Sequence, residues 1–205
     1  SEFELVYDIY CHEVGVRNCH VDITHAFLHG PCLFMGIEGV DIVKPKLTVK
    51  FPPLWSKITT GMTDIGSGNN FEYTAANYDD LLDCPIEIGC HETDGFKAAG
   101  KTHHLAFWGE HFKADGDLKT DMKKIVEHIA GVMGDIPYED YYFITHFAPN
   151  LYGGLEHKNS TALHFDGRKL SSRKDYLNWL CLVSHEYFHT WNVKRLRPKA
   201  LGPFD

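Results

Sequence analysis

The stretch LVSHEYFHTW, residues 182–191, contains two histidines four positions apart and a glutamate directly after the first. On an α-helix, residues four apart lie on one face about one turn apart, so His185 and His189 can both direct an imidazole nitrogen at one metal ion. Glu186 would then lie beside that ion, where its carboxylate can take a proton from metal-bound water. Because zinc lowers the pKa of bound water toward neutrality, the three residues could together hydrolyse an amide bond.

This interpretation needs a helix, because the pattern could also arise by chance in a chain with 14 histidines among 205 residues. The alternative is that two core histidines and a surface glutamate coincide in register. Ser172 and Asp175 have the spacing of a capping box, so we expect a helix to begin at Ser171 or Ser172. It should run to about Asn192, before Pro198 forbids its continuation. Its expected apolar stripe consists of Leu177, Leu180, Ser184, Phe188 and Trp191.

The set of metal ligands is incomplete in the sequence. A catalytic zinc site normally takes three protein ligands and leaves one position for water. Residues 190–205 contain no histidine, glutamate or cysteine, and their one carboxylate side chain belongs to Asp205. The third protein ligand is therefore expected to be absent from this chain. We interpret the chain as a truncated piece of a larger enzyme and expect it to be inactive by itself.

The first hundred residues predict strands and turns. Runs rich in β-branched and aromatic residues are separated by Gly, Pro, Asn and Asp. The expected strands cover residues 3–14, 19–30, 32–37, 45–52 and 85–90, and a short helical stretch covers 78–83. This pattern favours a β-rich N-terminal domain over residues 1–97.

Residues 98–205 predict a mixed sheet with two helices. The expected strands are residues 103–109, 141–147 and 152–165, followed by a turn or mobile loop at 166–172. Apolar residues recur at helical spacing between 116 and 135, where Asp117 and Gly134 are suited to cap the two ends. The expected fold class is α+β, with a β-rich domain followed by a sheet and the helix that carries His185 and His189.

Two stretches resemble a known family. SHEYFHTWNVKRLRPKALGPFD, residues 184–205, closely resembles the signature of the glycyl aminopeptidases, zinc metallopeptidases that often carry a C-terminal PDZ domain. YGGLEHKNSTAL, residues 152–163, is similar to the exopeptidase strand motif of aminopeptidase N-like enzymes. Residues 77–89 and 134–144 also look like segments of this family. The resemblance is therefore most specific from residue 77 onward.

The resemblance implies a thermolysin-like catalytic domain and a role for each motif residue. His185 and His189 would bind Zn²⁺, and Glu186 would act as the general base. Glu156 would bind the α-amino group of a peptide substrate with a free N-terminus, while Gly153 and Gly154 would let the substrate backbone approach the strand. The implied activity is removal of N-terminal residues, favouring small ones such as glycine. The remaining zinc ligand and an oxyanion-stabilising tyrosine would follow downstream.

Composition weighs against some other partners. The formal net charge of −8 argues against nucleic acid and anionic membrane surfaces, and no apolar run approaches the roughly 18 residues of a membrane-spanning helix. The six cysteines form no CxxC pair, so we expect buried thiols and a reducing compartment, the cytoplasm. Two alternatives stay open: a zinc hydrolase of a non-peptide bond, and a catalytically silent peptide- or protein-binding module.

The other histidine pairs are expected to be structural. HAFLH, residues 25–29, also spaces two histidines by four, but on a strand such side chains stand roughly 13 Å apart. His103 and His104 would point to opposite faces of a strand, so they could not readily bind one ion together.

Overall fold

The computed structural model describes residues 3–68, 70–111 and 113–201. In this part of the chain, residues up to Gly89 form two small antiparallel sheets. The first has the order β1–β2–β7–β4, with bounds His20–Val21, His25–Leu28, Ile86–Gly89 and Lys57–Thr60. The second has the order β3–β6–β5, with bounds Lys46–Val49, Phe71–Thr74 and Thr63–Asp64. Two short helices, α1 (Gly30–Leu33) and α2 (Tyr78–Leu82), belong to the same part of the chain.

The larger sheet has five strands in the order β11–β12–β10–β9–β8. Their bounds are Tyr152–Glu156, Ser160–Phe165, Asp140–Phe147, Lys101–Gly109 and Glu92–Ala98. β10 pairs in parallel with both β9 and β12, whereas β8 and β11 pair antiparallel with their neighbours. The sheet is therefore mixed, as the sequence predicts, and β11 lies at its edge. The chain passes from the N-terminal sheets to the five-stranded sheet between Gly89 and Glu92. The domain boundary expected at residues 97–98 lies a few residues later, at the end of β8.

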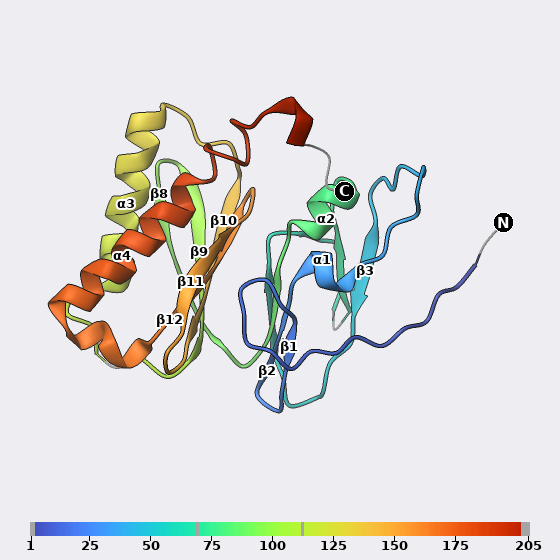
Figure 1. The fold of residues 1–205 in the computed structure, drawn as a ribbon, viewed down its shortest axis with the longest axis horizontal. Helices are drawn as coiled ribbons and strands as arrows, with labels where there is room; N and C mark the ends of the chain where they lie inside the picture. The colour runs from blue at the N-terminus through green and yellow to red at the C-terminus, as the bar shows by residue number, and fades with distance from the viewer. Residues whose placement is uncertain (1–2, 69, 112, 202–205) are drawn as a thin grey trace.

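Two long helices cover one face of the five-stranded sheet, and the N-terminal sheets lie on its other side (Figure 1). The helices are α3, Leu118–Met133, and α4, Arg173–Phe188. Alternate residues of a strand face opposite sides of a sheet, so one half of the buried strand residues packs against the helices. The core on the helix side includes Leu105, Phe143, Leu163, Val126 and Trp179.

The opposite face of the sheet joins it to the N-terminal part of the chain. Ala106, Ile144 and Ala162 follow the alternate set of strand positions and pack with Val16 and Phe27 in a smaller buried cluster. Phe27 lies on β2, so this cluster connects the β1–β2–β7–β4 sheet directly to the five-stranded sheet. α4 and the N-terminal sheets therefore lie on opposite faces of one five-stranded layer.

The two long helices differ in how their ends are formed. For α3 the prediction is confirmed at both ends: the Asp117 carboxylate accepts the Thr120 N–H at 2.9 Å, and Gly134 ends the helix at a φ of +83°. Ser172 does precede α4, but its side chain makes no capping hydrogen bond. α4 also ends at Phe188 rather than near Asn192, because the chain continues in turns.

The predicted apolar stripe of α4 was wrong in part: Trp191 is buried and Leu180 packs against the core, but other members face solvent. Leu177 and Phe188 are 42% and 39% exposed. The buried face instead carries Tyr176, Trp179, Leu182, Val183 and Tyr187, which contact the sheet and α3. The buried tyrosine hydroxyls find partners inside the protein: Tyr176 donates to the Asp121 carboxylate at 2.7 Å, and the Tyr187 and Tyr138 hydroxyls are 2.5 Å apart. The buried face of α4 is therefore formed largely by bulky aromatic side chains, and the hydroxyls of its tyrosines are hydrogen-bonded.

Some strand predictions also failed, because strands need partners. Residues 3–14 alternate but pair with no neighbouring strand and form none. Residues 32–37 begin in α1 and continue as irregular chain, and residues 152–165 form two strands, β11 and β12, rather than one. The expected loop at 166–172 contains a short 3₁₀ helix, Gly167–Ser171, and a second one spans Lys199–Leu201. The sequence analysis missed β4, β5, β6 and β8.

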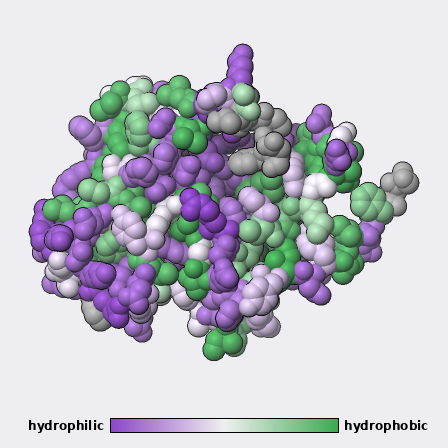
Figure 2. Space-filling view, viewed as in Figure 1, coloured by the Kyte–Doolittle hydropathy of each residue, from purple (hydrophilic) through white to green (hydrophobic). Residues whose placement is uncertain are grey.

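Hydrophilic and hydrophobic residues are interspersed on the face shown in Figure 2. Among the residues that the structure describes, no helix has both the length and the apolar character needed to cross a bilayer.

Candidate active site

The C-terminal part of α4 brings the two motif histidines together. The Nε2 atoms of His185 and His189 are 3.1 Å apart, so the rings converge as helix geometry predicts. Two nitrogens bound to one tetrahedral zinc ion at about 2.0–2.1 Å lie about 3.3 Å apart. The separation in the structure therefore fits a shared metal ion without rearrangement of the helix.

A backbone carbonyl sets the tautomer of His189. Its Nδ1 lies 3.0 Å from the carbonyl oxygen of Asn192. A carbonyl can only accept, so Nδ1 carries the proton and donates it, which leaves a lone pair on Nε2. Histidines that bind metals usually donate their other ring N–H to such an acceptor. The turn that follows α4 thus prepares His189 as a metal ligand.

Glu156 lies close to Glu186, as expected for the two motifs of one site. Glu156 is the last residue of the edge strand β11, and a carboxylate oxygen of each glutamate and a ring nitrogen of His189 lie within 4.8 Å of one another. Glu156 pairs opposite Thr161, which belongs to the strand positions that face α4. The edge strand and the helix therefore contribute to one cluster.

Gly154 packs directly against Glu186. A Cβ added there would lie 2.3 to 2.4 Å from the carboxyl group and Cγ of Glu186. The missing side chain thus makes room for Glu186, and the role of Gly154 toward a substrate stays a prediction. At Gly153, which has a φ of +154°, a Cβ would meet no atom within 4 Å. Open space beside the strand therefore exists at Gly153.

The surroundings of Glu186 raise the pKa of its carboxyl group. Burial is the largest cause, because the residue is 6% exposed and the charged form is desolvated. The carboxylate of Glu156 raises the pKa further, whereas His185 and His189 lower it. A glutamate whose pKa is shifted toward neutrality is suited to take and return protons at the pH at which most enzymes work.

Asp83, at the end of α2, holds the segments that flank the site. Its carboxylate accepts the Lys158 backbone N–H at 2.7 Å and the Lys194 ammonium group at 2.6 Å, and lies 3.3 Å from Nδ1 of His157. Burial by itself would raise the pKa of Asp83, but His157 and Lys194 outweigh it and lower the pKa to about 2. His157 and Lys158 directly follow Glu156, so the N-terminal part of the chain positions the edge strand.

Sequence reasoning did not find Asp83. The residue lies in a stretch that resembles the family, but nothing in its local pattern indicates partners that follow more than 70 positions later in the chain. The side chain is 4% exposed, so its charge is stabilised by the Lys194 ammonium group and by the hydrogen bonds that reach it.

The other histidines are mostly part of buried networks. His25 and His29 are both buried, and His25 Nδ1 lies 2.8 Å from a carboxylate oxygen of Glu87. The second oxygen of Glu87 lies 2.8 Å from His146 Nε2, whose ring in turn meets His164 at 3.0 Å. Glu87 therefore connects the N-terminal sheet to the five-stranded sheet.

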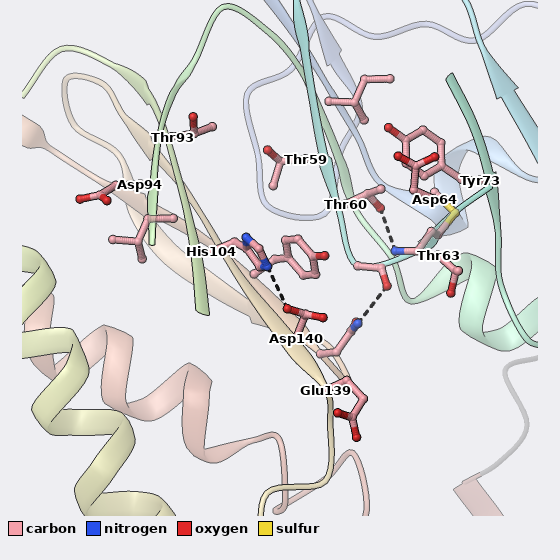
Figure 3. Close-up of a pocket in the computed structure, with 16 residues that line it drawn as sticks. Thr59, Thr60, Thr63, Asp64, Tyr73, Thr93, Asp94, His104, Glu139 and Asp140 are labelled. Carbon is pink, nitrogen blue, oxygen red and sulfur yellow. Dashed lines mark hydrogen bonds and ion pairs between the residues drawn. The ribbon is translucent and has the colours of Figure 1, made fainter. Parts of the chain in front are cut away.

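His103 and His104 point to opposite faces of β9, as expected. His103 is buried and lies 2.8 Å from the Tyr138 hydroxyl, while the half-exposed His104 lies 3.0 Å from the Asp140 carboxylate. His104 and Asp140 line a cavity of about 560 Å³ between the N-terminal sheets and the large sheet (Figure 3). The cavity is lined by none of the residues of the histidine and glutamate cluster.

The residues present can hold a cation, although the third ligand expected from the family is not among them. In the described residues after His189, up to residue 201, no histidine, glutamate or cysteine occurs, and Asp205 lies outside the described part. The carboxylates of Glu156 and Glu186 are the oxygen donors nearest to the histidine pair in the cluster.

Two family models match the chain. The M61 peptidase N-terminal domain matches residues 1–90, and the M61 glycyl aminopeptidase model matches residues 178–205, which include the two histidines and Glu186. A search of the curated proteins finds no match.

The fold is similar to solved structures of aminopeptidase-like proteins. An aminopeptidase N family protein from Idiomarina loihiensis is 35% identical, with a TM-score of 0.88 over 96% of this chain. The M1 zinc metallopeptidase from Deinococcus radiodurans is 12% identical, with a TM-score of 0.52 over 88% of this chain. A two-domain M1 zinc metallopeptidase mutant bound to L-arginine is 12% identical, with a TM-score of 0.51 over 85% of this chain.

The chain spans only part of these relatives: 35% of the Idiomarina protein, and 44% and 41% of the two M1 structures. The two M61 models match its beginning and its end, and the Idiomarina protein shares its fold over almost the whole length. The chain therefore belongs to the M61 glycyl aminopeptidase family of peptidases.

Proposed function

We propose that the protein containing this chain is a zinc-dependent aminopeptidase that removes small N-terminal residues, such as glycine, from peptides. The observation that carries the proposal is the cluster in which His185 and His189 converge beside Glu186, with Glu156 on the adjoining edge strand. Helix and strand come from separate motifs, and each contributes the residue types that this reaction requires. The preference for glycine rests on the family alone.

His185 and His189 would hold the zinc ion through their Nε2 atoms. When bound, zinc would supply a Lewis acid that polarises the scissile carbonyl and lowers the pKa of bound water. Glu186 would take the proton from the attacking water and return it to the amine that leaves. Its pKa, raised chiefly by burial, makes the Glu186 carboxylate a stronger base than an exposed glutamate, which supports its role in taking up the proton.

Glu156 would give the enzyme its exopeptidase character. A carboxylate at this position can pair with the ammonium group of a peptide's first residue. Because Glu156 and Glu186 each place an oxygen within 4.8 Å of the other and of His189, the amine would be held about one residue away from the reacting carbonyl. The edge strand β11 can also bind an extended peptide through main-chain hydrogen bonds, next to the open position at Gly153.

Further features of the whole protein are also proposals. A third zinc ligand, an oxyanion-stabilising tyrosine and a PDZ domain would lie outside this chain, and the 205-residue chain alone would lack activity. All six cysteines are free thiols, which supports the proposed cytoplasmic location. Fractionation of cells that express the protein tests this location directly.

The decisive experiment uses a longer chain that continues past residue 205 with its natural sequence. It should release the first residue from short peptides with a free amine and leave amine-blocked peptides intact. Glu186→Gln should abolish turnover while zinc stays bound, and Glu156→Gln should raise KM for free-amine peptides. Glu127→Gln, on the exposed side of α3, is the matched control. Near-normal turnover in Glu186→Gln would refute the mechanism, and equal cleavage of blocked peptides would refute the exopeptidase assignment.

A further inference from the structure

The β1–β2 hairpin gathers three potential metal ligands on one face. His20 pairs opposite Phe27, and Asp22 N donates to the His25 carbonyl oxygen at 3.0 Å across a turn of two residues, 23–24. Asp22 therefore lies opposite His25, and His20 lies two positions before Asp22. Because alternate residues of a strand share a face, the three side chains project to the same side of the hairpin.

The donor atoms of the three residues converge. One ring nitrogen of His20, one carboxylate oxygen of Asp22 and one ring nitrogen of His25 lie within 4.8 Å of one another. His20 Nε2 and Asp22 Oδ2 are 3.6 Å apart, close to the separation of about 3.3 Å for two ligands of a tetrahedral zinc ion. Small side-chain rotations would therefore bring all three atoms to bonding distance of one ion.

Hydrogen bonds prepare both imidazoles as ligands. His20 Nδ1 lies 3.1 Å from the His12 carbonyl oxygen, which can only accept, so the proton is on Nδ1 and the lone pair on Nε2. His25 Nδ1 lies 2.8 Å from a Glu87 carboxylate oxygen. In metal sites, a ligating histidine usually donates its other N–H to a carbonyl or carboxylate in this way. Both histidines therefore have the outer partner that a metal ligand requires.

His25 has a buried nitrogen that no protein atom satisfies. Its side chain is 1% exposed, and Nε2 has no hydrogen-bond partner among the described residues. A buried polar atom without a partner costs free energy unless a ligand satisfies it. This orphaned nitrogen is a second observation, independent of the clustering, that points to a bound ion.

The turn fixes the carboxylate of Asp22. Its Oδ1 accepts the Thr24 N–H at 2.6 Å, the Thr24 hydroxyl at 2.7 Å and the His25 N–H at 3.1 Å. These bonds leave Oδ2 directed toward His20. The Asp22 side chain is 39% exposed and the His20 side chain 11%, so the cluster is most open to solvent at Asp22.

We infer that the β1–β2 hairpin binds one divalent transition-metal ion, zinc by preference, through His20, Asp22 and His25. Two imidazoles and one carboxylate suit zinc, whereas magnesium and calcium require oxygen ligands. Glu87 is the outer partner that orients His25. The site is separate from the histidine pair on α4 and independent of the proposed peptidase function.

The position of the site suggests a structural role. Figure 1 shows β1 and β2 on the side of the N-terminal part that faces the large sheet. The Trp108 ring, on β9, stacks on His25 at a centroid distance of 3.6 Å, and its Nε1 donates to the Thr24 hydroxyl at 3.2 Å. A metal ion held here would therefore fix the hairpin against the five-stranded sheet.

The test is a zinc titration of the 205-residue chain with His185→Ala and His189→Ala, which remove the other histidine site. After treatment with a chelator, this variant should bind one equivalent of zinc in isothermal titration calorimetry. Adding Asp22→Asn or His20→Ala should weaken binding at least tenfold, and adding Glu87→Gln should weaken it by about 10- to 100-fold. His128→Ala, on the exposed side of α3, should leave the affinity unchanged.

Two readouts keep the test decisive. Asp22→Asn retains an amide oxygen for the turn, so it should fold even if His20→Ala does not. Zinc should also shift the Nε2 resonances of His20 and His25 in long-range ¹H–¹⁵N spectra of imidazoles. The inference is overturned if the double variant binds no zinc, or if Asp22→Asn binds it as tightly as its parent. Because the variant lacks the α4 pair, neither outcome bears on the proposed peptidase, which is tested by turnover of the longer chain.

Discussion

Replacing Asp83 by Asn should loosen the connection between the N-terminal part of the chain and the edge strand beside the active site. The carboxylate is 4% exposed and contacts His157, Lys158 and Lys194. An amide can still accept the Lys158 N–H, but it cannot form an ion pair with the Lys194 ammonium group. The substitution therefore removes charge from a buried position while preserving its shape.

The size of the effect follows from the pKa of Asp83. That pKa is lowered from the ordinary 3.8 to about 2, so the folded state favours the ionised form. This difference corresponds to about 2 kcal/mol of stability at neutral pH. Because the folded pKa lies below the unfolded one, the contribution is fully present above about pH 4 and is lost as the pH falls through 2.

Urea unfolding at pH 7, 5 and 3 measures this contribution. Asp83→Asn should lower the free energy of unfolding by about 2 kcal/mol at pH 7, and the deficit should shrink at pH 3. Asp41→Asn, an exposed aspartate in an irregular segment, should match the unsubstituted chain at all three pH values. Equal stability of Asp83→Asn and the unsubstituted chain at pH 7, or a deficit that does not change with pH, would refute the reasoning.

Three further substitutions test the site and the helix that carries it. Gly154→Ala should displace the Glu186 carboxyl group and lower turnover of the longer chain by at least tenfold. The control Gly131→Ala, which has open space around it on α3, should be neutral or stabilising. Turnover of Gly154→Ala equal to that of the unsubstituted protein would contradict the packing of Gly154 on Glu186. Glu186→Gln should stabilise the metal-free chain at pH 7 but not below about pH 4, because the raised pKa of Glu186 makes its ionisation unfavourable to folding. If urea unfolding of this variant shows no such pH dependence, that result would count against a buried, ionised glutamate. Trp179→Ala should cost about 3–5 kcal/mol in the same assay because the side chain is fully buried, and a cost below 1 kcal/mol would show that α4 packs on another face.

What the sequence predicted best lies within single elements. The convergence of His185 and His189 depends only on the helical period, so it could be stated from two positions in one motif. The caps of α3 at Asp117 and Gly134 are equally local, and both were confirmed. Strands were less predictable because a strand needs a neighbour: residues 3–14 have the right pattern but no partner strand, while β8 has a partner and a weak pattern.

The orientation of α4 shows why packing is harder to predict than helix formation. The apolar pattern selects Leu177 and Phe188, yet both are substantially exposed. The tyrosines at 176 and 187 look polar in the sequence, but their hydroxyls are satisfied by Asp121 and Tyr138, and their rings can then be buried. Burial of these rings depends on partners from α3 and from the segment before β10, which the sequence of α4 does not reveal.

The relation between Gly154 and Glu186 joins the two motifs physically. Sequence reasoning could assign each motif a role but could not say why the strand motif needs a glycine opposite the helix. The structure supplies a reason: the strand passes so close to α4 that a Cβ at Gly154 would occupy the space of the Glu186 carboxyl group. That close approach also brings the carboxylate of Glu156 near His189. Gly154 therefore permits the close approach between the strand that would bind the substrate amine and the helix that would hold the zinc.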